Sequence, residues 1–101
     1  MSPKARLFRY EKYIDRFGNT AEIKIWIVPA SEHHPDGVKY SLVYVVDGVR
    51  LIGFDNERGK GDHFHLDDSE NPYKFSGVGN LLKDFLRTVN EWKEKRYGNQ
   101  G

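Results

Sequence analysis

The 101-residue sequence contains no cysteine. This absence excludes disulfide bonds, thiolate metal ligands and a cysteine nucleophile, and it suits a protein of the reducing cytoplasm. The sequence also lacks any apolar run long enough to cross a bilayer, and residues 1–6 lack the apolar stretch of a signal peptide. We therefore expect a cytoplasmic protein that does not enter a membrane.

The chain has almost no excess of charge of either sign. Sixteen lysines and arginines oppose fifteen acidic residues, which gives a formal net charge of +1. Contact with a nucleic acid would therefore depend on a local cluster of cations and not on overall charge. The length fits a single domain, residues 1–101, without room for a second core. No pattern in the sequence predicts a cofactor.

Alternating apolar and polar residues predict a sheet over about residues 6–66. The expected strands cover residues 6–14, 21–28, 40–46 and 49–54, with a short further strand at 63–66. Asp47-Gly48 is a strong signal for a two-residue hairpin turn. Counted from that turn, Tyr44 is expected to face Leu51, and Tyr40 is expected to face Asp55.

The period changes after a loop expected at residues 67–72. Apolar residues then follow three- and four-residue steps, which predicts a helix over about residues 76–96 with Ser76 as its N-cap. The fold class is therefore α+β: an antiparallel β-meander of four to five strands with one C-terminal helix packed on one face.

One helix cannot cover a whole sheet, so apolar side chains on the other face should stay available to a partner. The expected register divides the central hairpin into two candidate sets: Tyr40, Leu42, Tyr44 and Leu51, or Val43, Val45, Ile52 and Phe54. This arrangement predicts a homodimer or a complex with another protein.

The segment from Asp55 to His65 is the most informative part of the chain. It follows the apolar strand 49–54, so its polar groups should emerge together at one end of a rigid element. A buried core does not need such a collection, whereas a phosphate, a nucleic-acid backbone or a metal ion does. The candidate residues are Asp55, Asn56, Arg58, Gly59, Lys60, Gly61, His63 and His65.

The chemistry of this segment suits RNA. His63 and His65 should point the same way from a strand, with Cα atoms roughly 6.6 Å apart, and imidazole is the natural general acid and base near neutral pH. The loop before them has cations that can hold phosphate oxygens and glycines that let the backbone approach closely. These loop residues are Arg58, Lys60, Gly59 and Gly61.

Simpler interpretations exist for the same residues. A His-X-His pair is often structural, the glycines can simply turn the chain, and Asp55 can cap the strand end by accepting from loop amides or from Tyr40. A metal site lacks a convincing third ligand beside the histidines, although three aspartates are possible. These are Asp55, Asp62 and Asp67. We expect no bound metal.

The sequence resembles the TumE family over roughly residues 22–91. Residues 39–44, 54–65, 72–75 and 81–85 carry the resemblance, and its central motif is an aromatic-Asp-Asn group, a glycine-rich basic loop and His-X-His. The resemblance implies a toxin of a prokaryotic toxin–antitoxin module. It also implies a neighbouring antitoxin as partner, often a helix-turn-helix DNA-binding protein. It supplies no catalytic mechanism, so the residue roles come from their chemistry.

The leading hypothesis is a toxin that acts on RNA as an endoribonuclease-like enzyme. Asp55 organises the site while His63 and His65 transfer protons. The expected residues for RNA or phosphate binding are Asn56, Arg58, Gly59, Lys60 and Gly61. Two alternatives remain: a non-catalytic protein-interaction module in which the polar cluster is a structural latch, and a metal-dependent phosphodiesterase.

Overall fold

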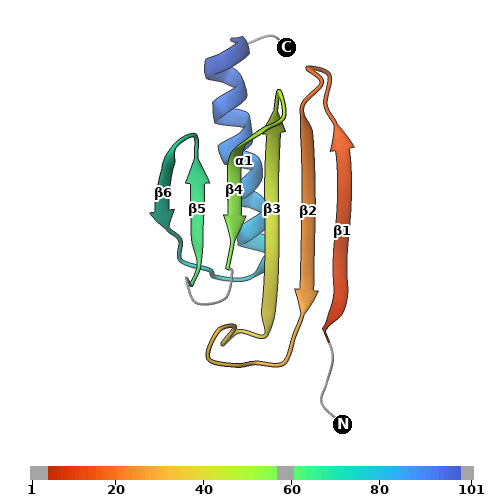
Figure 1. The fold of residues 1–101 in the computed structure, drawn as a ribbon, viewed down its shortest axis with the longest axis vertical. Coiled ribbons are helices and arrows are strands. Elements are labelled where there is room, and N and C mark those ends of the chain that lie inside the picture. The colour runs from red at the N-terminus through yellow and green to blue at the C-terminus, as the bar shows by residue number, and fades with distance from the viewer. Residues whose placement is uncertain (1–4, 57–60, 99–101) are drawn as a thin grey trace.

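A computed structural model describes residues 5–56 and 61–98. Its elements are β1 Arg6–Ile14, β2 Thr20–Ile27, β3 Val38–Val46, β4 Val49–Asp55, β5 His63–Leu66, β6 Ser69–Pro72 and α1 Val78–Tyr97. Each strand pairs antiparallel with the next, in the order β1-β2-β3-β4-β5-β6 (Figure 1). The α+β meander is confirmed, whereas the expected number of strands was too low, because the sheet has six.

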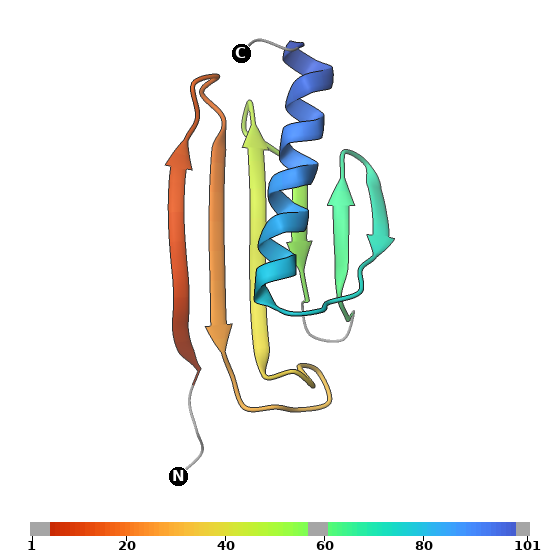
Figure 2. The same ribbon diagram turned by 180° about the vertical axis from the view of Figure 1, so that it is seen from behind.

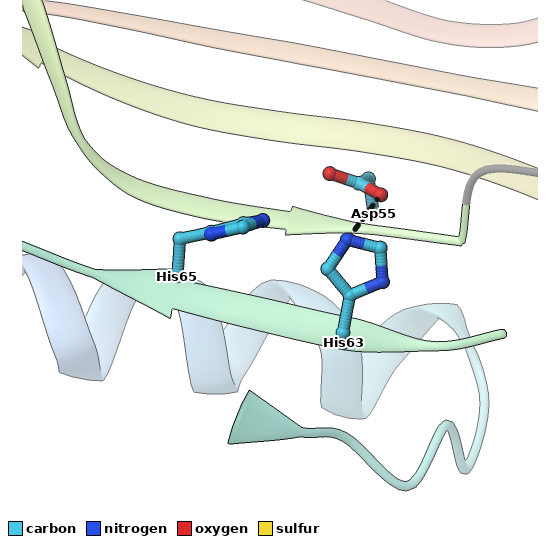
Figure 3. Close-up of side chains that lie close together, drawn as sticks. All are labelled: Asp55, His63 and His65. Carbon is cyan, nitrogen blue, oxygen red and sulfur yellow. Dashed lines mark ion pairs between the residues drawn. The ribbon is translucent and has the colours of Figure 1, made fainter. Parts of the chain in front are cut away.

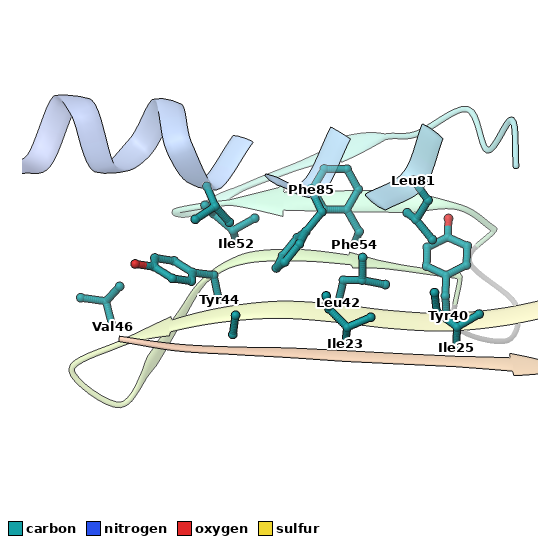
Figure 4. Packing of buried hydrophobic residues seen from close by; sticks show 12 residues of the cluster. Ile23, Ile25, Tyr40, Leu42, Tyr44, Val46, Ile52, Phe54, Leu81 and Phe85 are labelled. Carbon is teal, nitrogen blue, oxygen red and sulfur yellow. The ribbon is translucent and has the colours of Figure 1, made fainter. Parts of the chain in front are cut away.

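The hydrophobic core lies between α1 and one face of the sheet (Figures 2 and 4). Buried and partly exposed residues alternate along β2 and β3, so that Ile25 and Leu42 point towards the helix. The helix contributes Leu81, Phe85 and Val89, which are four residues apart and therefore lie on one side of it. The spacing of these apolar residues therefore determines which side of α1 packs on the sheet. The opposite face of the sheet stays uncovered in the described part of the chain. We call that uncovered side the open face.

A β-bulge changes the register of the central hairpin. The predicted turn pairs Val46 with Val49 as expected, but Tyr44 pairs with Ile52 and not with Leu51. The shift arises because β4 contains one residue more than β3 at this point. The predicted partner of Tyr44 was therefore wrong.

The same bulge reverses the sheet face towards which each later residue of β4 points, compared with the expected register. Ser41, and not Tyr40, lies opposite Asp55, and Ile52 and Phe54 join the buried face together with Tyr40. The two apolar sets expected from the uninterrupted register were therefore wrong. Two valines of β3 remain on the open face: Val43 and Val45.

The C-terminal segment departs from expectation in two places. Residues 69–72 form β6 where a loop was expected, and α1 begins at Val78 after an N-cap at Gly77 without a side-chain cap. Ser76 is not the cap; its hydroxyl and carbonyl accept hydrogen bonds from Asn80. Gly77 has φ 107°, which favours glycine. The helix is not apolar enough over its length to span a membrane.

A polar latch joins the β1–β2 turn to the helix. Asp15 Oδ1 accepts hydrogen bonds from the backbone amides of Phe17 at 2.9 Å and Asn19 at 3.0 Å. Its Oδ2 accepts from the Tyr44 hydroxyl and lies 3.6 Å from Lys93 Nζ on α1. Burial alone raises the pKa of Asp15, but these hydrogen bonds and the lysine charge outweigh it and hold that pKa below 3.8.

We expect Asp15→Asn to lower the free energy of unfolding by about 1–3 kcal/mol at pH 7, because a charged acceptor is lost from the latch. The folded pKa of Asp15 lies below the unfolded value, so its contribution is present above pH 3.8 and is lost as pH falls through the lower folded value. Urea denaturation across this pH range measures the difference. Asp36→Asn, at an exposed loop residue, is the control, and equal losses in both variants would refute the latch.

Candidate functional site

Four polar side chains from three neighbouring strands meet on the open face. Asp55 at the end of β4 lies opposite His63 at the start of β5, and His65 lies opposite Glu70 of β6. Alternation explains their orientation: Phe54 and Phe64 stack on the helix side, so the residues on either side of them point away from it. Figure 3 shows Asp55, His63 and His65 from this cluster.

His63 has polar contacts at both of its ring nitrogens. Its Nε2 lies 2.9 Å from Asp55 Oδ1 and 3.5 Å from Glu70 Oε2, and the side chains of His63 and Asp55 are 8% and 18% exposed. Its Nδ1 donates to the backbone carbonyl of Gly61 at 3.0 Å. The ring is therefore oriented from both ends.

His65 is more accessible. Its side chain is 20% exposed, and its Nε2 lies 3.4 Å from Glu70 Oε2. The His63 and His65 rings meet edge to face with centroids 5.1 Å apart, so the two-residue spacing does place both on one side. An open depression beside them is lined by Asp62, His63, Glu70, Asn71 and Pro72.

Asn56, predicted to contact RNA or phosphate, is buried and bonded to the sheet. Its Oδ1 accepts from the backbone amide of Tyr40 at 3.0 Å, and its Nδ2 donates to the carbonyl of Val38 at 2.7 Å. The side chain thus extends the pairing of β4 with β3 by one residue. Gly61 adopts φ 70° beside the site. The predicted phosphate-binding residues Arg58, Gly59 and Lys60 lie outside the described residues.

Tyr40 fixes the segment that precedes His63. Its hydroxyl donates to Asp62 Oδ2 at 2.6 Å, and its backbone amide is held by Asn56. Burial and the Asp62 carboxylate raise the pKa of Tyr40 well above 10.0, so the hydroxyl remains a donor. Both donor groups of Tyr40 therefore bond to residues other than Asp55. The hydrogen bond from Tyr40 to Asp55 suggested by the sequence is replaced by these two contacts.

Two residues near the site were missed from the sequence. Glu70 reaches the histidines because Asp67-Asp68 is a two-residue turn between β5 and β6, with Asp67 at φ 56°. Arg50 packs along Gly53, where an added Cβ would lie 3.1 Å from its Cδ. Since Gly53 lies opposite His65, the arginine stem runs beside the cluster. Recognising Asp67-Asp68 as a hairpin turn would have found Glu70.

The open face also carries aromatic and basic side chains on its N-terminal strands. Lys24 and Trp26 of β2 alternate with the buried isoleucines, and Lys39 pairs opposite Trp26 with its Nζ 5.7 Å from the indole ring centroid. Tyr10 of β1 pairs opposite Lys24, and half of its surface is exposed. These groups share one face of the sheet with the acid–histidine cluster.

The fold and the cluster define a small α+β protein with an acid–histidine site on an uncovered sheet face. The family model described as Toxin TumE matches residues 3–93, so the chain belongs to the TumE toxin family. Membership makes it a toxin of a toxin–antitoxin module and implies an antitoxin partner. Neither the curated proteins nor the solved structures gave a match.

Proposed function

We propose that this toxin acts on RNA as an endoribonuclease-like enzyme, with Asp55, His63 and His65 as its reactive centre. The observation that carries the proposal is the convergence of these side chains on the open face, where their ligand atoms lie within 4.8 Å of one another. Imidazole and carboxylate groups can assist phosphodiester cleavage by moving protons at the attacking and leaving oxygens. An RNA-directed toxin of this kind works in the cytoplasm.

The remainder of the open face supports binding of single-stranded RNA. Exposed aromatic rings stack on unpaired bases, and lysines beside them neutralise the backbone. Tyr10, Trp26, Lys24 and Lys39 provide this combination on β1–β3. A strand of RNA crossing the sheet from β1 would therefore reach the histidines on β5.

Cations near the reactive centre would position the scissile phosphate. Arg50 lies along Gly53 in the strand next to His65, and a guanidinium can hold two phosphate oxygens at once. The loop cations Arg58 and Lys60 serve the same purpose in our proposal. Asn56 supports the site indirectly, because its amide secures the end of β4 on which Asp55 lies.

The direct test is incubation of the purified chain with a mixed RNA pool, followed by sequencing of the new RNA ends. We expect cleavage at unpaired positions, with much slower cleavage of the same sequences in duplexes, because the stacking surface needs free bases. Growth arrest on expression provides the cellular readout. Growth arrest without new RNA ends in cells or in the purified reaction would refute the proposed activity.

The antitoxin is, in our proposal, a helix-turn-helix protein that covers the open face, and the free toxin is a homodimer. The edge strand β1 supports a protein contact, because it exposes apolar side chains, with Leu7 57% and Ile14 70% exposed, and an exposed edge strand offers unpaired backbone groups to another chain. Light scattering of the toxin alone and after mixing with the product of the neighbouring gene measures both states. A neighbour that neither binds the toxin nor rescues growth would refute this pairing.

The non-catalytic alternative has one observation in its favour. The short Asp55–His63 contact is largely buried, as a structural latch would be, and the open face would then act only by binding protein. This alternative predicts that the histidines affect stability and partner binding but not any rate of RNA cleavage.

A further inference from the structure

Ligand atoms of Asp55, His63 and His65 lie within 4.8 Å of one another on the open face, and Glu70 Oε2 lies near both rings. A backbone carbonyl can only accept, so His63 Nδ1 carries the hydrogen that bonds to Gly61. In a neutral imidazole this leaves a lone pair on Nε2, which faces carboxylate oxygens of Asp55 at 2.9 Å and Glu70 at 3.5 Å. Oxygen and nitrogen lone pairs repel, so a positive centre must lie between them: either a proton or a metal ion.

The number of ligand atoms gathered here points to an ion held by several of them rather than to one shared proton, because Asp55, His63 and His65 each offer an atom within 4.8 Å of the others. A proton explains the 2.9 Å contact of His63 with Asp55, while Glu70 Oε2 lies farther from the two rings, at 3.5 and 3.4 Å. Those separations are too long for good hydrogen bonds. They are close to the roughly 3.4 Å between neighbouring ligands around a tetrahedral metal with bonds of about 2.1 Å, whereas the 2.9 Å separation of His63 and Asp55 is shorter than that.

We propose that Asp55, His63 and His65, with Glu70 completing the set, bind one divalent transition-metal ion. The two carboxylates give the cluster negative charge that attracts a cation, and the Gly61 carbonyl orients His63 as outer partners of metal-bound histidines do. Two nitrogen and two oxygen donors without sulfur suit Zn²⁺, Mn²⁺, Fe²⁺ or Ni²⁺. They suit Mg²⁺ and Ca²⁺ poorly, since those ions prefer oxygen donors.

Metal binding stands on this geometry alone, while its consequence for RNA cleavage rests on the proposed function. A bound ion would supply a Lewis acid and a positive charge for a phosphate oxygen. It would also offset the two carboxylates that otherwise repel the RNA backbone. His63 and His65 would then act as metal ligands. Water at the site would take over the proton transfers proposed for them above.

Calorimetric titration of the chelator-treated full-length chain tests the site, with Zn²⁺, Mn²⁺ and Ni²⁺ as ligands and Mg²⁺ for comparison. We expect one transition-metal ion per chain and a melting temperature that rises on binding. His65→Gln and Asp55→Asn should each weaken binding by about 100-fold. His33→Gln, at an exposed loop residue, is the matched control and should bind as the wild type does.

Absence of binding, or binding that His65→Gln and Asp55→Asn leave unchanged, would overturn the metal site and leave the proton between Asp55 and His63. Circular dichroism of both variants establishes that a weakened titration reflects lost ligands and not an unfolded chain. Metal binding without RNA cleavage would support the site and contradict the proposed function. Cleavage by a chain that binds no metal would support the function and contradict the site.

Discussion

Replacing His65 with alanine is expected to lower the rate of RNA cleavage by about 100-fold or more, both if its ring assists proton transfer and if it holds a metal ion at the site. The free energy of unfolding should change by less than about 1 kcal/mol, as for substitutions that leave the core intact. His65 is partly exposed and lies beside Glu70 at 3.4 Å, whereas the more buried Asp55–His63 contact does not depend on it. Cleavage of a labelled RNA and urea denaturation measure the two effects on the same preparation.

His33→Ala is the control for this experiment, because His33 is an exposed histidine in the β2–β3 connection. It should leave both measurements at wild-type values. Wild-type cleavage by His65→Ala would remove His65 from the reactive centre. A large loss of stability would favour the non-catalytic alternative, in which the acid–histidine cluster is a structural latch. His63 cannot separate these alternatives as well, since its ring contacts both Gly61 and Asp55.

The elements with a regular apolar spacing could be predicted, because only one type of secondary structure buries all of their apolar residues on one side. The β2 alternation that buries Ile23 and Ile25 requires a strand with one face inside. The four-residue spacing of Leu81, Phe85 and Val89 requires a helix with one side inside. In both elements the hydrophobic face and the secondary structure follow from the same residues.

The β-bulge could not be predicted, because β4 is apolar on both sides. With Leu51, Ile52 and Phe54 nearly consecutive, either register buries apolar side chains, and the pattern does not choose between them. Packing against α1 makes the choice: Ile52 and Phe54 are buried, while Leu51 is only partly so. Tertiary contact therefore decides which strand residues reach the open face.

The acid–histidine cluster was only partly predictable for a related reason. The spacing of His63 and His65 places both rings on one side of a strand, but their distance from Asp55 depends on the pairing of β4 with β5. Glu70 depends on β6, whose sequence Ser-Glu-Asn-Pro has a loop-like composition. Such a strand forms because its neighbour provides backbone partners and it lies at the edge of the sheet.

Replacing Phe85 with alanine is expected to lower the free energy of unfolding by about 3–5 kcal/mol, the usual cost of removing a buried aromatic ring. Phe85 is 0% exposed in the core, where its ring meets Phe54 edge to face at a centroid distance of 6.1 Å. One helix covers the buried sheet face in the described residues, so no second element can close the cavity. Domains of this size have about 5–15 kcal/mol in total.

Thermal unfolding followed by circular dichroism should show the loss as a melting temperature lower by at least about 12 °C. Leu86→Ala is the matched control: it removes a side chain from the next position of α1, but Leu86 is 44% exposed, so its effect should stay within about 1 kcal/mol. Equal effects of the two substitutions would contradict the helix orientation. Because Phe54 precedes Asp55 directly in β4, a loosened helix should also weaken metal binding at the open face, even though Phe85 lies on the other side of the sheet.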